Sequence, residues 1–218
     1  TEKATQEYVV HIDSDVFLAE GALATLLSEF RGSDCASMHA LGELRPQGNK
    51  LSYWESAQEE HARLSWALSG QQPRLGTAFC IFRRETILKY GFESGYGGGL
   101  DDIDLEMRLR KDGRTLGVSS ARVYFHYRAD LKSFFRTRFL WGRVAAGYVR
   151  KYGVWHARFW PPLRTVFWLG ACVVKRRPRL VPYFVVDGIA GTTGMVKGFF
   201  ELAGDASRKT AADKGPNT

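Results

Sequence analysis

An apolar run that ends in two carboxylates constrains this chain more than any other feature. Residues 8–17 read YVVHIDSDVF, with Asp13 and Asp15 directly after the run. Such runs are typical of a buried strand, and side chains two residues apart in a strand point to the same side. Both carboxylates can therefore face one ligand, and paired oxygen donors suit Mg2+ or Mn2+, which would in turn hold phosphate oxygens. The simpler alternative is that these acids cap the following helix.

The amino-acid composition is that of a globular protein from a reducing compartment. The chain has 218 residues, 44% of them hydrophobic and 13% aromatic. This is enough for one medium domain with a real core, or for a domain with an appendage. The three cysteines, Cys35, Cys80 and Cys172, are odd in number and lack a C-x-x-C spacing. This pattern argues against a disulfide framework or a zinc site.

Positive charge is concentrated in the second half of the chain. Residues 128–179 hold 13 Lys and Arg against one acid, Asp130, whereas the whole chain has a net charge of +8. A segment this basic is expected to meet phosphate on nucleic acid, on lipid headgroups or on a substrate. We expect an α/β domain over residues 1–127, a basic, aromatic helical segment over 128–203 and a disordered tail over 204–218.

The spacing of apolar residues predicts an α/β fold. In some segments these residues recur with the period of a helix, and in others they form short β-favouring runs. Helices are expected over residues 20–30, 51–68, 85–91, 103–113 and 131–152, and strands over 8–17, 35–44, 77–82 and 114–127. A proline and a glycine indicate a turn at residues 46–49.

A glycine-rich stretch delivers a second pair of acids. Residues 92–104 read FESGYGGGLDDID, in which four glycines within five positions (95, 97, 98 and 99) precede Asp101 and Asp102. The favourable field at a helix N-terminus explains one or two acids here. Adjacent carboxylates repel each other, however, and a cation or a substrate hydroxyl would compensate for that repulsion.

Two apolar runs lie in the second half of the chain. The first, residues 165–174, is too short to cross a bilayer, which takes about 20 apolar residues. The second, residues 180–200, is longer but is interrupted by Asp187, Lys197 and several glycines. We therefore expect this part of the chain to lie in a membrane interface rather than to span the membrane.

Three of these features occur in an order that resembles the second half of a family 2 glycosyltransferase of the GT-A fold. The D-x-D of residues 13–15 comes first, and the segment GTAFCIFRRE of residues 76–85 follows. Next come Gly91-Phe92-Glu93 and then DDIDLEMR at residues 101–108. The resemblance covers residues 5–153, and the combination is far more specific than any one of its parts.

The resemblance implies a fold and a set of roles. The fold would be a partial GT-A domain, a Rossmann-like mixed sheet with flanking helices, followed by the basic, partly membrane-interfacial helical segment. Asp13 and Asp15 would hold Mg2+ or Mn2+ and the diphosphate of a nucleotide-sugar donor. Asp102 would be the catalytic base, beside Asp101, where the family more often has Glu. His126, which in an aromatic strand is otherwise a packed side chain, would be a further metal ligand.

The implied function is metal-dependent, inverting transfer of a sugar from a nucleotide-sugar donor to an acceptor hydroxyl. The expected partners are a nucleotide-diphosphate sugar, a glycan or lipid-linked acceptor and an anionic membrane surface, without nucleic acid. This fits cell-surface glycan or glycolipid synthesis on the cytoplasmic side of the membrane, with peripheral attachment. The first half of the family's domain would precede Thr1, so we expect the chain alone to be inactive. Residues 135–139 lack the Gln and Trp of the processive motif, which favours a non-processive enzyme.

Two other functions fit parts of the sequence. In a haloacid-dehalogenase-like phosphatase Asp13 would be the nucleophile, Asp15 an acid, and Asp101 and Asp102 late metal ligands. That scheme requires an apolar strand directly before the late acids, which GYGGGL does not resemble. Alternatively, residues 128–179 would form a nucleic-acid-binding module. The neighbouring apolar runs favour a membrane over nucleic acid.

Overall fold

The computed structural model describes residues 3, 5–45, 50–68, 74–93, 99–153 and 159–213. The chain forms two compact units: Thr1–Ser94 with Asp101–Asp130, and Gly95–Leu100 with Leu131–Thr218. The expected turn at residues 46–49 and three of the four loop glycines, at 95, 97 and 98, lie outside the described residues. The boundary between the expected catalytic domain and the expected helical segment stays a prediction.

The first unit contains a mixed five-stranded sheet with the strand order β1-β4-β3-β5-β2. Its strands are β1 Tyr8–Ile12, β2 Val16–Leu18, β3 Ser37–Leu44, β4 Phe79–Arg83 and β5 Leu116–Phe125. Strands β3 and β5 are parallel, and the other neighbours are antiparallel. The predicted α/β class, with a mixed sheet and flanking helices, is confirmed.

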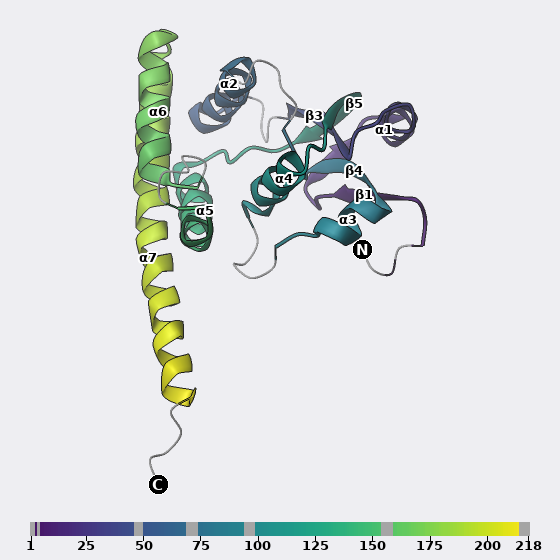
Figure 1. Ribbon diagram of the computed structural model, residues 1–218. Helices are drawn as coiled ribbons and strands as arrows, with labels where there is room; N and C mark the ends of the chain where they lie inside the picture. The colour runs from purple at the N-terminus through teal and green to yellow at the C-terminus, as the bar shows by residue number, and fades with distance from the viewer. Residues whose placement is uncertain are drawn as a thin grey trace. The chain divides into compact units, whose positions relative to one another are not determined.

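Helices cover both faces of this sheet (Figure 1). Helix α1 Ala22–Arg31 covers one face, and α3 Arg84–Tyr90 and α4 Asp101–Lys111 cover the other. Helix α2 Tyr53–Leu68 belongs to the same unit. Successive side chains of β4 point to opposite faces, as in any strand. Phe79 and Ile81 pack in the core with α1, whereas Cys80 and Phe82 pack with α3 and α4. The continuous apolar run of β4 thus reflects a strand that is buried on both faces.

Strand β5 contains a bulge where it pairs with β3. The register goes from Ala40↔Ser119 to Leu41↔Arg122, so two residues of β5, Ser120 and Ala121, have no counterpart on β3. A neighbouring side chain stabilises the backbone of the bulge: the Ser119 Oγ accepts a hydrogen bond from the Ala121 N–H at 3.0 Å. Bulges of this kind bend a strand and increase its twist.

A short connection joins the two edges of the sheet. Strands β1 and β2 lie at opposite edges, yet only residues 13–15 separate them. In a flat sheet the edges would be about 19 Å apart, whereas the chain from residue 12 to residue 16 reaches at most about 14 Å. The sheet must therefore curve until its edges approach each other. The sequence predicted one strand over residues 8–17 and gave no sign of this crossing.

The second unit consists mainly of three helices. They are α5 Leu131–Tyr152, α6 Pro161–Val174 and α7 Val181–Asp213, with a short 3-10 turn at Pro178–Leu180. Glycines allow α5 and α7 to touch along their backbones, because a Cβ on Gly142 would lie 2.0 Å from the Gly191 carbonyl oxygen. Helix α7 continues past Gly204, where the sequence predicted a disordered tail to begin.

Three charged side chains pair inside this helical unit. The Asp187 carboxylate on α7 lies 3.1 Å from the Arg138 Nε on α5 and 3.1 Å from an Arg164 Nη on α6. Arg138 also donates to the Tyr183 hydroxyl at 2.6 Å, and burial raises the pKa of Tyr183 to about 12. Part of the basic segment is therefore internal and holds the helices together.

Across the ranges that the structure describes, none of the helices has both the length and the hydropathy that crossing a membrane requires. That the basic segment lies in a membrane interface stays a prediction.

Glu29 on α1 offers a test of the bulge. Its carboxylate accepts the Ser120 N–H at 2.9 Å and the Ser120 hydroxyl, and hydrogen bonds from Ser119 and Ser120 lower its pKa below the ordinary 4.5. A carboxylate whose pKa is lower in the folded state than in the unfolded state stabilises the fold at pH values above its ordinary pKa. This contribution is lost as the pH falls through the folded-state pKa. We expect Glu29→Gln to lower the urea midpoint at pH 7 and to lose less stability between pH 5 and pH 3 than the unsubstituted chain.

The control for this experiment is Glu85→Gln, which neutralises an exposed carboxylate on α3, away from the bulge. Its urea midpoint should follow that of the unsubstituted chain across the pH range. Equal behaviour of the two variants would contradict the role assigned to Glu29.

Candidate active site

The backbone between β1 and β2 is fixed by hydrogen bonds. The Asp13 N–H donates to the Ala78 carbonyl at 2.9 Å, which extends the β1–β4 pairing by one residue, and the Val16 N–H donates to the Asp13 carbonyl at 3.2 Å. The Asp13 side chain is 45% exposed, and Asp15 is exposed. The first acidic pair therefore sits on an ordered turn at one end of the sheet.

A histidine that the sequence analysis missed lies beside the first acid. His11 Nδ1 donates to the Thr77 carbonyl at 2.7 Å and lies 3.8 Å from Asp13 Oδ1. Its ring packs on Phe92, with 5.7 Å between ring centroids. The alternation of side chains along a strand could have found it, because residues 11 and 13 point to the same side.

The acids of α4 fall into two groups, and Asp104 belongs to the structural one. It is completely buried and pairs with Arg108 Nε at 2.7 Å. Arg108 also donates to the carbonyls of Tyr90 and, at 2.8 Å, Gly91. Asp104 and Arg108 thus join α4 to the end of α3, so this part of the D-D-x-D-L-x-x-R motif maintains the fold.

Glu106 anchors the opposite flank of the same helix. It is 3% exposed, accepts the Leu75 N–H at 3.1 Å and pairs with Arg110 Nε at 3.0 Å. With Asp104 and Glu106 occupied in this way, Asp101 and Asp102 are the partly exposed acids of the first turn. Asp102 Oδ1 accepts the Ile103 N–H at 2.8 Å.

Electrostatic interactions show that the early and late acids lie close together. The pKa of Asp13 is raised, first by burial and then by the neighbouring Asp15 and Asp101 carboxylates, while His11 opposes the shift. The pKa of the buried Cys80 thiol is raised by burial and by the charges of Asp13 and Asp102. The structure therefore brings these four carboxylates to one region of the first unit, where a cation would relieve their repulsion.

His126 lies at the same end of the sheet. The β2–β5 register pairs Val16 with Phe125, so Asp15 and His126 are the next residues outward on the two strands. His126 Nδ1 donates to the Arg45 carbonyl at 2.7 Å, which leaves the Nε2 lone pair available. Metal-binding histidines usually have this second hydrogen bond. The role of His126 as a ligand stays a prediction.

Asp13 and Asp15 are the carboxylates of this region that would hold a divalent cation. Among the described residues, no group of three or more His, Cys, Asp or Glu side chains is close enough to hold a metal. Mg2+ is, however, commonly bound by one or two carboxylates, with water and substrate phosphates as the other ligands. Asp13 and Asp15 fit that mode of binding, in which the substrate completes the coordination.

The comparisons with known proteins give a fold but no family. No protein-family model and no curated protein matches the chain. The chain is similar to a solved structure, the mannosyltransferase PcManGT from Pyrobaculum calidifontis in complex with GDP-Man and Mn2+, with a TM-score of 0.57 and 14% identity. The similarity covers 92% of this chain and 64% of that one. The chain thus has the fold of a glycosyltransferase structure and spans about two thirds of its length.

The pairing of Asp104 with Arg108 can be tested by unfolding. In Arg108→Met the Asp104 carboxylate would remain buried without its guanidinium partner, which costs about 3–5 kcal/mol. We expect the urea midpoint to fall accordingly. Arg114→Met, at an exposed position just beyond α4, should change the midpoint little. Similar midpoints for the two variants would show that the buried pair does not stabilise the fold.

Proposed function

We propose that this protein is a metal-dependent glycosyltransferase of the GT-A type, similar to family 2, that moves a sugar from a nucleotide-sugar donor to an acceptor hydroxyl. The observation that carries the proposal is the convergence of two acidic pairs, 88 residues apart in the chain, at one end of a glycosyltransferase-like sheet. The fold alone would not carry it, because one fold supports many functions.

The two acidic pairs take different parts in this proposal. Asp13 and Asp15, on the turn after β1, hold Mg2+ or Mn2+ together with the donor diphosphate. A divalent cation in this place neutralises the charge that the leaving nucleoside diphosphate gains. Asp101 and Asp102 begin α4, which the buried Asp104 and Glu106 hold in position. The base is thereby placed by a rigid helix rather than by a free loop.

Asp102 serves as the general base. An acceptor hydroxyl has a very high pKa, so a carboxylate within hydrogen-bond reach must take its proton as the new bond forms. The acceptor oxygen attacks the anomeric carbon while the bond from that carbon to the diphosphate breaks. A single displacement of this kind inverts the anomeric centre.

The complete reaction requires more than the described site. This chain covers 64% of the solved glycosyltransferase, so the binding of the nucleotide base is part of the proposal and not of the described site. The acceptor in this proposal is a glycan or a lipid-linked sugar on the cytoplasmic side of the membrane. Mannose and GDP belong to the solved structure, and the donor of this chain is not inferred from them.

The phosphatase alternative has less support from the structure. It requires a strand directly before Asp101 and Asp102, but Asp101 is the first residue of α4. The two residues before it, Gly99 and Leu100, have the left-handed φ values 100° and 69°, which are incompatible with a strand.

Asp102→Asn should separate catalysis from binding. In the full-length enzyme, we expect a 100- to 10,000-fold lower kcat, on the order of a lost general base, with unchanged donor affinity. Transfer is measured with a nucleotide sugar and acceptor, and donor affinity by calorimetry. Asp34→Asn, before β3, is the matched control. Turnover near that of the control would remove Asp102 as the base.

Asp13→Ala should instead affect the metal-dependent step. We expect weaker binding of the nucleotide-sugar donor in the presence of Mn2+, because the cation loses one of its two protein ligands. Titration calorimetry with and without Mn2+ measures the difference between the two conditions. Asp34→Ala serves as the control, and an Asp13→Ala variant that keeps its Mn2+-dependent donor affinity would contradict the assignment.

A further inference from the structure

Helix α7 exposes an apolar stripe on the side away from its helix contacts. The exposed side chains are Val181, Val185, Ile189, Val196, Phe199 and Phe200. At 100° per residue these positions fall within one sector of about 100°. The glycines that contact α5 or α6, Gly188, Gly191, Gly194 and Gly198, lie outside this sector. The stripe is therefore a face that neither neighbouring helix covers.

Helix α6 carries a second stripe of the same kind. Val166 is 68% exposed, Val173 is 77% exposed and Val174 is 76% exposed. Phe167 shares their side of the helix, whereas Trp168 on the other side is buried and stacks on Phe184 of α7. Side chains this exposed and this apolar are uncommon as a contiguous group on a soluble surface.

The two stripes are joined by a groove between the helices. Helices α6 and α7 run antiparallel, since Trp168 stacks on Phe184 and Thr165 contacts Gly188. The groove has a volume of 460 Å³ and is lined by Pro162, Thr165, Val185, Gly188, Ile189, Thr192 and Thr193. Pro162 and Val166 are one helical turn apart, so the α6 stripe continues from the edge of this groove.

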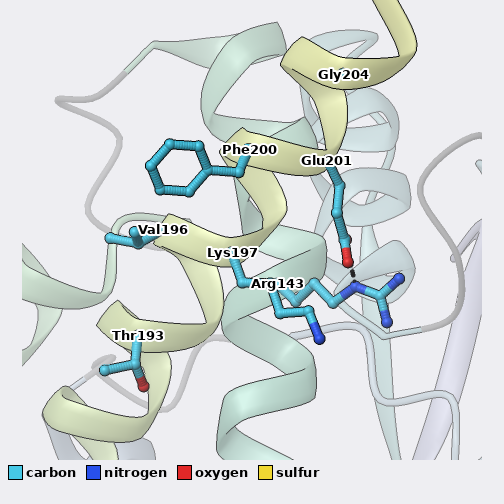
Figure 2. A pocket seen from close by; sticks show the side chains of 7 residues that line it. All are labelled: Arg143, Thr193, Val196, Lys197, Phe200, Glu201 and Gly204. Atoms are coloured by element: carbon cyan, nitrogen blue, oxygen red, sulfur yellow. Dashed lines mark hydrogen bonds and ion pairs between the residues drawn. The ribbon is translucent and has the colours of Figure 1, made fainter.

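The stripe of α7 also borders a second, more distal hollow. Figure 2 shows Thr193, Val196 and Phe200 projecting to one side of α7, while Glu201 reaches across to Arg143. This hollow has a volume of 810 Å³. Val196 and Phe200 thus extend the apolar stripe of α7 along one side of this hollow, whose lining also includes the charged Arg143, Lys197 and Glu201.

Positive charge lies at the turn between the two striped helices. The side chains of Lys175, Arg176, Arg177 and Arg179 are all exposed. Residues 161–200 contain six Lys and Arg and a single acid, Asp187, which is buried between two arginines. The exposed part of this hairpin is thus apolar and cationic, with no acidic side chain within residues 161–200 on its surface.

We propose that the α6–α7 hairpin docks on an anionic lipid surface. The apolar stripes enter the boundary between headgroups and acyl chains, and the basic turn binds lipid phosphates. The stripe from Val181 to Phe200 is about 29 Å long, a length that suits a helix lying in the plane of the interface. A nucleic acid would match the cationic turn but would leave the valines and phenylalanines exposed. The hairpin belongs to the second unit, and its docking does not depend on the transfer reaction.

The charge arm of the test uses vesicles of phosphatidylcholine with and without phosphatidylglycerol. The full chain should sediment with the anionic vesicles, less strongly at high salt, and weakly with the neutral ones. Lys175→Glu with Arg176→Glu should weaken binding to anionic vesicles by at least about fivefold per residue. Lys111→Glu with Arg114→Glu makes the same change of charge at exposed positions in the first unit and should bind as the unsubstituted chain does.

The apolar arm replaces exposed side chains of the stripes. Phe167→Asp and Phe200→Asp should abolish most vesicle binding, whereas Phe200→Leu, which keeps the position apolar, should retain it. Leu23→Asp, at a 46% exposed position on α1, is the control for adding a charge to the protein. Circular dichroism of each variant checks that the helices are intact.

Three results would overturn the proposal. The full chain could fail to bind anionic vesicles, or the Asp variants could bind as strongly as the control. Light scattering could also show a dimer that forms without vesicles and that Phe167→Asp and Phe200→Asp dissociate, which would assign the face to a second copy of the chain. None of these measurements detects sugar transfer. A failure of this proposal would therefore not contradict the proposed function.

Discussion

The candidate site depends on a short connection between the two edges of a curved sheet. Three residues join β1 to β2, which are four strands apart, and two of the three are the acids Asp13 and Asp15. Strand β5, which pairs with β2, contains a two-residue bulge that is tied to α1 through Glu29, and a bulge of this kind bends its strand. The pairing of β2 with β5 places Asp15 beside His126, at the end of the sheet where the acids lie.

The acids at the start of α4 have two different roles within one short motif. Asp104 and Glu106 are buried and each is paired with an arginine, so they belong to the interior of the unit. Asp101 and Asp102 remain partly exposed and add their charge to the region around Asp13. A buried paired carboxylate is costly to disturb, and this gives the exposed pair a fixed position. Motif matching alone would have treated all four acids as one group.

The sequence predicted local structure well and spatial arrangement poorly. Helix α5 has the predicted bounds, because its apolar period is clear over many turns. The crossing between β1 and β2 was missed, since strand order is set by pairing with residues a hundred positions away. The bulge at Ser120 was missed for the same reason, as nothing local marks it. The convergence of the acidic pairs was inferred from a resemblance to a known fold, and spacing alone would not have given it.

The basic segment illustrates a second limit of reading charge from sequence. The segment as a whole was expected to meet phosphate, yet two of its arginines, Arg138 and Arg164, pair with Asp187 inside the helical unit. Net charge along a chain does not distinguish internal from surface positions, because burial depends on the helix face that each residue occupies. The stripe of exposed valines and phenylalanines, by contrast, could have been found from its period.

The shared carboxylate of Asp187 has a consequence for the orientation of α7. A rotation of this helix about its own axis would leave two guanidinium groups in a poorly solvated interior without a counterion. Buried polar groups can in this way select one rotational orientation of a helix among several that apolar packing alone would allow. The pairing of Asp187 thereby determines which side of α7 faces outward. A single buried acid thus determines that the opposite, exposed side of the helix is apolar.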